Sequence, residues 1–315
     1  MTKLIIQIPC YNEEHTLGIT LDALPRQLPG IDLVEWLVID DGSRDRTFEV
    51  AKAYGVDHII RFSTNQGLAK AFIAGIEAGL KAGADLIVNT DADNQYCAED
   101  IPLLIQPILL GQAAIVIGAR PIWEIRHFSL SKKLLQKLGS WVVRLASNTH
   151  IPDAPSGFRA FSREAAMQIN VFNNYTYTLE TIIQAGQKGM TITSVPIRTN
   201  SVLRPSRLVK SPASYVMRSL FTILRIFMLY KPLRFFLISG SIPFSLGFLL
   251  GCRWLVYFWL GTDRTRIPSL ILAAILILIG FQLWMFGLVA DLMAANRRLL
   301  EEVQLRLRRR DYDYD

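Results

Sequence analysis

The stretch LIVNTDADNQY, at residues 86–96, carries the most distinctive chemical pattern in the chain. An apolar run rich in β-branched residues ends in Asp91 and Asp93, two carboxylates one residue apart, and Gln95 follows at the same spacing. Alternate residues of an extended stretch point their side chains to one side. Like charges this close repel each other unless a cation or hydrogen-bond donors lie between them. A positive partner is therefore expected at this site.

Three further polar clusters also follow apolar runs. They are PCYNE at 9–13, DDGSRD at 40–45 and the Ala-Arg pair at 119–120. Any one of them could be a turn or a helix N-cap, and the Asp-Gly-Ser at 41–43 alone favours that simpler interpretation. Four polar clusters at one edge of a sheet, however, indicate a binding site.

The elements that position these clusters can be predicted from the apolar pattern. Strands are predicted in KLIIQIP, WLVID, HIIRF, DLIVNTD and AIVIGA, and helices at 16–24, 46–54, 68–82, 98–110 and 131–147. This alternation is typical of an α/β domain with a largely parallel sheet, which binds ligands beyond the carboxyl ends of its strands. After residue 150, the polar and aromatic stretch APSGFRAFS precedes a helix at 178–188 and a strand in MTITSVPIR.

The C-terminal third is much more apolar than the rest of the chain. At 315 residues the chain could form one large or two modest domains, and its 51% hydrophobic content is high for a purely soluble protein. The excess lies at 235–262, interrupted by Arg253, and at 267–290, which carries no charge. About 20 apolar residues span a bilayer core, so a hairpin of two membrane-spanning helices is predicted. The alternative is a pair of buried helices in a soluble core, but the second run lacks a polar face.

The basic residues around these runs predict their orientation. Those outside the hairpin are Arg218, Arg225, Lys231 and Arg234 before it, and Arg297, Arg298, Arg306, Arg308, Arg309 and Arg310 after it. The connecting loop has only Arg264 and Arg266, beside Asp263. The positive-inside rule then puts both termini and the first 230 residues in the cytosol. The N-terminus shows no pattern of a signal peptide.

The net charge of +7 and the pI near 9.4 could indicate a nucleic-acid partner. The basic residues gather from Arg198 onward, beside the apolar runs, which favours anionic lipid head groups and no nucleic acid. Cys10, Cys97 and Cys252 show no metal-ligand spacing and suit a reducing compartment.

Four regions are expected along the chain. An α/β domain at 1–210 ends in the basic loop NSVLRPSRLVKSP, and amphipathic helices at 211–232 lie on the membrane surface. The transmembrane hairpin covers 233–292, and a basic cytosolic tail covers 293–315. Glycines in the hairpin permit a homo-oligomer.

The motif series PCYNE, VIDDGSRDRT, NQGLAKAFIAGIEAG, DADNQY, GAR and SGFRAF resembles, in this order, that of family-two glycosyltransferases with the GT-A fold. The resemblance covers residues 3–200. Within the family, the chain looks most like the polyisoprenyl-phosphate glycosyltransferases, the group of dolichol-phosphate mannose synthase, in a bacterial branch with two C-terminal spans. This implies a nucleoside-diphosphate-sugar donor, a polyisoprenyl-phosphate acceptor and a location in the bacterial cytoplasmic (inner) membrane, which the two spans would cross.

The resemblance also implies roles for the clustered residues. Asp91, Asp93 and Gln95 would hold Mg²⁺ or Mn²⁺, whose charge stabilises a diphosphate leaving group. The nucleotide-sugar pocket would comprise Pro9, Tyr11, Asn12, Glu13, Asp40, Asp41, Gly67, Lys70, Asp91, Ala92 and Arg120. Lys70 could instead be a solvated helix residue.

The remaining roles concern the transfer itself. Arg120 and Arg159 would contact sugar or phosphate, because guanidinium groups bind phosphate oxygens bidentately. The basic loop would meet the phosphates through Arg204, Ser206, Arg207 and Lys210. The family often has a Ser-Lys pair where this chain has Ser206-Arg207. Together with Asp93 and Arg159, Asp153 is a catalytic candidate, either orienting the acceptor or acting as a base, although a loop cap is the simpler alternative.

The expected reaction is inverting transfer of glucose from UDP-glucose to undecaprenyl phosphate. GDP-mannose and a UDP-linked amino sugar are alternative donors. A processive polysaccharide synthase would usually show a QxxRW motif and more spans, and neither occurs in this chain. A non-catalytic sugar-nucleotide sensor is a further alternative, which the intact DADNQ motif disfavours.

Overall fold

The computed structural model describes residues 1–121, 144, 147, 149, 151–171, 177–201, 224–225, 228–261 and 267–313. Two compact units result: Met1–Leu220 with Val303–Asp315, and Phe221–Glu302. Most of the helix predicted at 131–147 and most of the amphipathic segment predicted at 211–232 lie outside the described residues.

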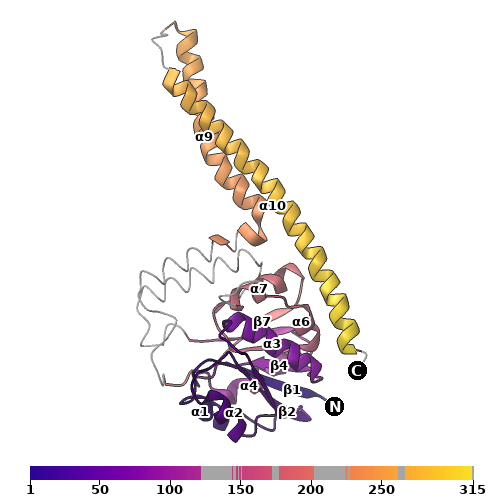
Figure 1. Ribbon diagram of the computed structural model, residues 1–315. Coiled ribbons are helices and arrows are strands. Elements are labelled where there is room, and N and C mark those ends of the chain that lie inside the picture. Colours follow the sequence, from indigo (N-terminus) through magenta and orange to yellow (C-terminus); the bar gives the residue numbers. More distant parts are fainter. Residues whose placement is uncertain are drawn as a thin grey trace. The chain divides into compact units, whose positions relative to one another are not determined.

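The first unit is built on a mostly parallel sheet, as predicted (Figure 1). Among the described residues the strand order is β3-β2-β1-β4-β6-β5-β7. The strands are β1 (Lys3–Cys10), β2 (Leu33–Asp40), β3 (His58–Arg61), β4 (Leu86–Asn89), β5 (Ile115–Ala119), β6 (Arg159–Ser162) and β7 (Ile192–Pro196). Strand β6, which the apolar pattern did not predict, runs antiparallel between β4 and β5. It carries the second half of the SGFRAF motif to the centre of the sheet.

Helices cover both faces of this sheet. They are α1 (Leu17–Ala23), α2 (Thr47–Ala53), α3 (Leu68–Lys81), the 3₁₀ helix η1 (Ala98–Asp100), α4 (Ile101–Leu109), α6 (Arg163–Gln168) and α7 (Thr178–Gln187). Buried residues of α1, α2 and α4 form one core with alternate side chains of β1 and β2, such as Ile6, Ile8 and Val38. Residues one position along, such as Ile5 and Ile39, face α3 on the opposite side. This three-layer arrangement leaves the strand ends open for a site.

Helix α3 lies unusually close to the sheet because two glycines face it. A Cβ atom added to Gly75 would lie 2.4 Å from Oε1 of Gln7, and one added to Gly79 would lie 2.9 Å from Cδ1 of Ile87. Neither position has room for a larger side chain. The predicted helix at 68–82 is therefore confirmed and held close to β1 and β4.

The second unit contains α9 (Pro232–Trp259) and the greater part of α10 (Ile267–Asp313). The two helices pack antiparallel through small residues: a Cβ on Gly280 would lie 2.6 Å from Cβ of Phe244, and one on Gly247 would lie 2.7 Å from the carbonyl oxygen of Ala273. Both helices are long and apolar enough to cross a membrane, and only 11% and 17% of their most apolar windows are buried. The exposed apolar surface favours lipid around them over a protein core.

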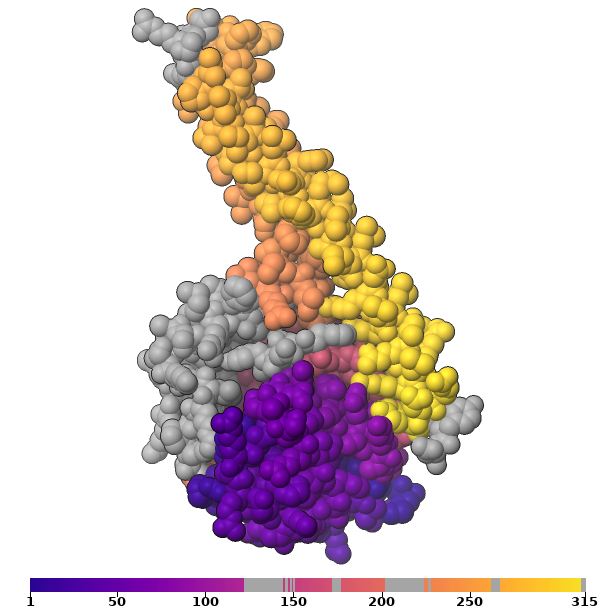
Figure 2. All heavy atoms as spheres, viewed as in Figure 1, coloured from indigo at the N-terminus to yellow at the C-terminus, as the bar shows by residue number. Residues whose placement is uncertain are grey.

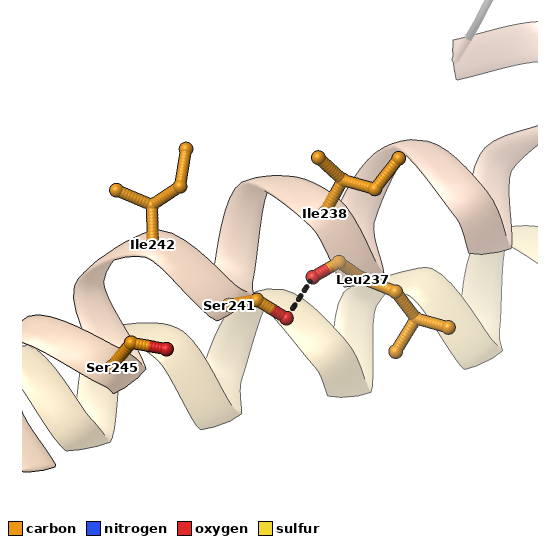
Figure 3. Close-up of a pocket in the computed structure, with 5 residues that line it drawn as sticks. All are labelled: Leu237, Ile238, Ser241, Ile242 and Ser245. Atoms are coloured by element: carbon orange, nitrogen blue, oxygen red, sulfur yellow. Dashed lines mark hydrogen bonds between the residues drawn. The ribbon is translucent and has the colours of Figure 1, made fainter.

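Two serine hydroxyl groups on α9 bond within the helix. The Ser241 hydroxyl donates to the Leu237 carbonyl at 2.8 Å, on a shallow face shared with Ile238, Ile242 and Ser245 (Figure 3). The Ser239 hydroxyl donates likewise to Phe235. Such bonds allow serine to lie in apolar surroundings without leaving a polar group unpaired.

The end of α10 belongs to the first unit and lies in the region expected to be a basic cytosolic tail, 293–315. The helix continues to Asp313, and its last turns pack on the α/β unit, where the C-terminal residues are coloured yellow (Figure 2). The buried Arg308 donates to the carbonyls of Met167 and Ile169, at 3.2 and 2.8 Å, and pairs with Glu77 at 3.1 Å. The cytosolic location of 293–315 stays a prediction, and within this region Arg308 is a buried docking contact.

Candidate active site

The strand register brings the polar clusters to one edge of the sheet. Cys10 at the end of β1 pairs with Asp40 at the end of β2, and Asp40 pairs with Arg61 at the end of β3. On the other side of β1, Gln7 pairs with Asn89, the last residue of β4. Because these strands are parallel, the segments that follow them leave the sheet side by side. The prediction that PCYNE, DDGSRD and DADNQ lie at a common edge is confirmed.

The first two loops are joined by hydrogen bonds. The backbone N–H of Asn12 donates to the Ser43 hydroxyl at 2.9 Å, and the side-chain oxygen of Asn12 accepts from the Arg44 N–H at 2.9 Å. Asn12 has a φ of 55°, in the left-handed region where asparagine is enriched. The adjacent Glu13 is buried and accepts from the Thr16 hydroxyl at 2.6 Å, while Tyr11 is 38% exposed. The two loops, 9–13 and 40–45, thus form one wall of the site, with the ring of Tyr11 accessible at its surface.

Asp40 and Asp41 are both buried at this wall, but they have different environments. One oxygen of Asp40 accepts from the Ser43 N–H at 2.8 Å, and the other lies 3.3 Å from Arg61. Asp41 accepts backbone N–H bonds at 2.7 and 2.9 Å from Gln66 and Gly67, the residues that lead into α3. Burial raises the pKa of Asp41 despite these donors. Asp41 therefore links the β2 end to the start of α3.

The start of α3 holds two further candidates of the nucleotide pocket. Gly67 is the N-cap of α3 and has a φ of 96°, which only glycine adopts readily. Lys70 is exposed, and its ammonium group lies 3.4 Å from the side-chain oxygen of Gln66. Its position one turn into the helix fits a solvated residue as well as a ligand contact.

The acidic motif follows β4 and concentrates negative charge. Gln95 donates through its side chain to Asp93 at 2.9 Å and through its backbone N–H at 3.2 Å. Burial, followed by the charge of Asp91, raises the pKa of Tyr96 to about 12 and that of Tyr177 well above its usual value. Within the described part of the chain, no three His, Cys, Asp or Glu side chains gather closely enough to hold a metal ion. The motif therefore offers two carboxylates and an amide, an all-oxygen set that fits a hard cation with its other ligands supplied by substrate or water.

Arg120 and Asp153 form a buried ion pair beside this motif. Nε and Nη2 of Arg120 donate to the two carboxylate oxygens of Asp153 at 2.7 and 3.0 Å, and the Arg120 backbone N–H donates at 3.2 Å. The Asp153 side chain is 1% exposed, whereas that of Arg120 is 14% exposed. Asp153 thus holds Arg120 in place, and the guanidinium group is the partner with access to a ligand.

Arg159 has a different environment from the one expected for a substrate contact. Its side chain is fully buried and donates to the carbonyls of Ala154, Ser156 and Thr178 and to the Thr181 hydroxyl, at 2.5–2.8 Å. Burial lowers its pKa to about 10, so it stays charged at neutral pH. These bonds fix the loop before β6, which brings Gly157 close to Asp91: a Cβ on Gly157 would lie 3.1 Å from that carboxylate.

Several residues that organise the site were not predicted. Asn89 is buried and bonds to Gln7, to the Gly157 carbonyl and to the Tyr177 hydroxyl, at 2.8–2.9 Å. Tyr96 accepts from the Gly157 N–H at 2.9 Å. All of these partners are 61–88 residues away in the chain, so no local pattern marks Asn89 or Tyr96. The predicted phosphate contacts Arg204, Ser206, Arg207 and Lys210 lie outside the described residues.

Comparison with known proteins agrees with this geometry. The family model described as Glycosyl transferase family 2 matches residues 5–169. An undecaprenyl-phosphate mannosyltransferase of Micrococcus luteus is 29% identical over 205 residues, covering 62% of this chain and 82% of that protein. A UDP-N-acetylglucosamine–dolichyl-phosphate N-acetylglucosaminyltransferase of Methanococcus voltae is 30% identical over 219 residues, covering 62% and 86%.

Among solved structures, glucosyl-3-phosphoglycerate synthase of Mycobacterium tuberculosis in complex with Mn²⁺, UDP and phosphoglyceric acid has a TM-score of 0.54 at 20% identity. The match covers 70% of this chain and 78% of that one.

The chain belongs to Glycosyl transferase family 2. The GT-A fold expected from the motif series is confirmed, as is the resemblance to the polyisoprenyl-phosphate group, from which named relatives come. The two apolar C-terminal helices also agree with the predicted spans.

Proposed function

We propose that the protein transfers a sugar from a nucleoside diphosphate sugar to a polyisoprenyl phosphate. The observation that carries this proposal is that one chain joins the acidic site at the sheet edge to two helices whose apolar surface is largely exposed. A glycosyltransferase with such helices suits an acceptor that lies in the membrane. Two of its relatives are named for undecaprenyl phosphate and dolichyl phosphate, both of this lipid class.

The donor's diphosphate would lie at the acidic motif. Asp91, Asp93 and Gln95 would hold Mg²⁺ or Mn²⁺, which supplies Lewis-acid stabilisation of the leaving diphosphate. The all-oxygen donor set supports this choice, and so does the Mn²⁺ and UDP complex of the structural neighbour. Ala92, between the two aspartates, is buried and would approach the ligand through its backbone.

The nucleoside would bind across the β1 and β2 ends. Tyr11 is exposed enough to stack on a base, and Asn12 and Pro9 shape the wall beneath it. Glu13, Asp40 and Asp41 are the acceptors for ribose and base N–H or O–H groups. Gly67 and Lys70 would complete the pocket at the start of α3.

The acceptor would approach from the side of Arg120. Its guanidinium group is suited to a phosphate oxygen, and Asp153 orients it through the bidentate pair. We assign Arg159 a positioning role, because its donors are directed at the loop 153–157 and at the first turn of α7. Arg204, Ser206, Arg207 and Lys210 remain proposed contacts of the lipid phosphate.

The proposed transfer inverts the anomeric configuration. A phosphate oxygen of the acceptor attacks the anomeric carbon, the bond from that carbon to the donor's diphosphate breaks, and the nucleoside diphosphate leaves. The acceptor oxygen is already anionic at pH 7, so positioning contributes more than deprotonation. UDP-glucose is the donor and undecaprenyl phosphate the acceptor that we propose, with GDP-mannose and UDP-N-acetylglucosamine as competitors because relatives are named for those sugars.

The location that we propose is the bacterial cytoplasmic membrane, with the site and both termini in the cytosol, and homo-oligomers are permitted.

A panel of acceptors tests the proposed function. Detergent-solubilised protein would receive each labelled nucleotide sugar with undecaprenyl phosphate or with 3-phosphoglycerate, the soluble acceptor class of the structural neighbour. Label extracted into organic solvent only with the lipid, and lost with chelator or in Asp93→Asn, is expected. Label transferred only to phosphoglycerate would contradict the proposal.

A further inference from the structure

The backbone of the acidic motif is held by side chains from elsewhere in the chain. Beyond Asn89 the motif leaves β4, and its carbonyls would lack sheet partners on that side. The Thr20 hydroxyl donates to the Ala92 carbonyl at 3.0 Å. Asn200 donates through its side-chain amide to the carbonyls of Asn94 and Tyr96, at 3.0 and 3.3 Å. These two residues therefore determine the path of the chain through the motif.

Asn200 makes more contacts with the motif than Thr20 does. Its backbone N–H donates to the Gln95 carbonyl at 2.9 Å, and its amide lies 3.4 Å from the side-chain oxygen of Asn94. The carbonyls of three consecutive motif residues, 94, 95 and 96, thus accept from this one asparagine. These carbonyls belong to the segment that follows Asp93 and includes Gln95. Asp93 and Gln95 are two of the side chains proposed to bind the metal ion.

The motif backbone turns at Asn94. Its φ is 54°, in the left-handed region where asparagine is enriched, as at Asn12. This conformation turns the chain sharply between Asp93 and Gln95 and lets Gln95 bond back to Asp93. The side-chain amide of Asn200 contacts both the carbonyl and the side-chain oxygen of Asn94, so Asn200 is well placed to hold this turn.

Asn200 is itself held in position by a second anchor. Asp100, which is buried, accepts from the Arg198 backbone N–H at 2.6 Å and from its Nε and Nη2 at 3.0 and 2.7 Å. Tyr96 and Thr199 form a bridge between the same two segments. The stretch 198–200 is thereby fixed to the residues that follow the motif, so its amide is ordered before any ligand binds.

We infer that Asn200 is a positioning residue for metal binding by the acidic motif. It holds the turn at Asn94, and the turn sets the separation of the Asp93 and Gln95 side chains. This inference rests on the proposed function, because it presumes that these side chains bind a divalent cation. Residues that orient metal ligands typically change affinity by about 10- to 100-fold when they are removed.

Two substitutions isolate the amide of Asn200. Asn200→Asp keeps the shape and the backbone N–H but replaces the donating amide with a carboxylate, and Asn200→Ser keeps a shorter donor. Gln168→Ala is the control, because it removes an exposed amide that bonds only to Glu164 among its described contacts. Full-length protein in detergent would be titrated with Mn²⁺ in the presence of UDP, with free Mn²⁺ measured by electron paramagnetic resonance, and thermal unfolding recorded for each variant.

The expected result is Mn²⁺ binding at least about tenfold weaker in Asn200→Asp, a smaller loss in Asn200→Ser and no change in Gln168→Ala. A merely structural role would lower the melting temperature of the Asn200 variants while folded protein kept its Mn²⁺ affinity, and that result would overturn the inference. If Asn200→Asp does not fold, Asn200→Ser decides by the same criterion. Wild-type protein that binds no Mn²⁺ with UDP would instead contradict the proposed metal site itself.

Discussion

At the scale of single residues, burial separates the groups that can meet a substrate from those that hold them. Arg120 and Arg159 were predicted together as sugar or phosphate contacts, but their exposures differ: 14% of the Arg120 side chain is accessible and Arg159 is fully buried. Residue type and spacing identify charged groups near a site. They do not show where the donors point, because that depends on carbonyls such as that of Thr178, which is distant in sequence.

Asp153 provides a prediction at this scale. Asp153→Asn should lower the free energy of unfolding by roughly 2–4 kcal/mol, because the buried Arg120 loses its ionic partner. Transfer to lipid should fall much more than donor binding, which should stay within a few fold. Thermal unfolding, calorimetry with the donor and lipid extraction measure the three quantities. Asp22→Asn, at an exposed position, should change stability by less than about 0.5 kcal/mol.

An Asp153→Asn protein that loses donor binding in proportion to transfer would place Asp153 in the donor pocket. One with unchanged stability would contradict the role assigned to the ion pair.

At the scale of elements, the strongly periodic segments could be predicted closely from the sequence. The helices expected at 16–24, 46–54 and 68–82 occur as α1, α2 and α3 with ends within two residues. Strand β6 could not be predicted, because its residues RAFS form no apolar run like those of β3 and β4, and both of its partner strands, β4 and β5, are distant in the sequence. The docking of Arg308 was not predicted either, because its burial depends on Glu77 and on carbonyls that are distant in the sequence.

The glycines between α9 and α10 provide a prediction for these elements. Gly280→Ala should destabilise the helix pair by about 1–3 kcal/mol, because its Cβ would lie 2.6 Å from Phe244 and 2.7 Å from the Gly240 carbonyl. Gly251→Ala meets nothing within 4 Å and should have little effect. Thermal unfolding in detergent compares the two variants. Equal melting temperatures would show that the helices do not pack through Gly280.

At the scale of the whole molecule, one helix takes part in both compact units. Residues 267–302 of α10 lie in the unit with α9, and residues from 303 onward lie in the α/β unit. Arg308 makes docking contacts with Glu77 of α3 and with the carbonyl of Ile169, just after α6. Arg309 pairs with Glu164 of α6. Arg163 adds a bond from α6 to the Tyr312 carbonyl at 2.7 Å. The last turns of α10 are thus part of the α/β unit.

Removing the Arg308 contacts should loosen α6 selectively. In Arg308→Ala, the carbonyls of Met167 and Ile169 lose a buried donor, so amide hydrogen exchange in α6 and at 169–170 should accelerate. The local loss should be about 2–4 kcal/mol. Arg310→Ala is the matched control two residues further along, because its side chain is 70% exposed. Equal exchange in the two variants would contradict the docking role.

The central claim is transfer of the sugar alone to the lipid phosphate, and the stoichiometry of the released nucleotide tests it most directly. Purified protein with undecaprenyl phosphate and UDP-glucose would be analysed by mass spectrometry for both the lipid product and the nucleotide. We expect one UDP released per lipid, with the lipid gaining one hexose and no additional phosphate. Release of UMP with a pyrophosphate-linked lipid, or of UDP with only free glucose, would contradict it.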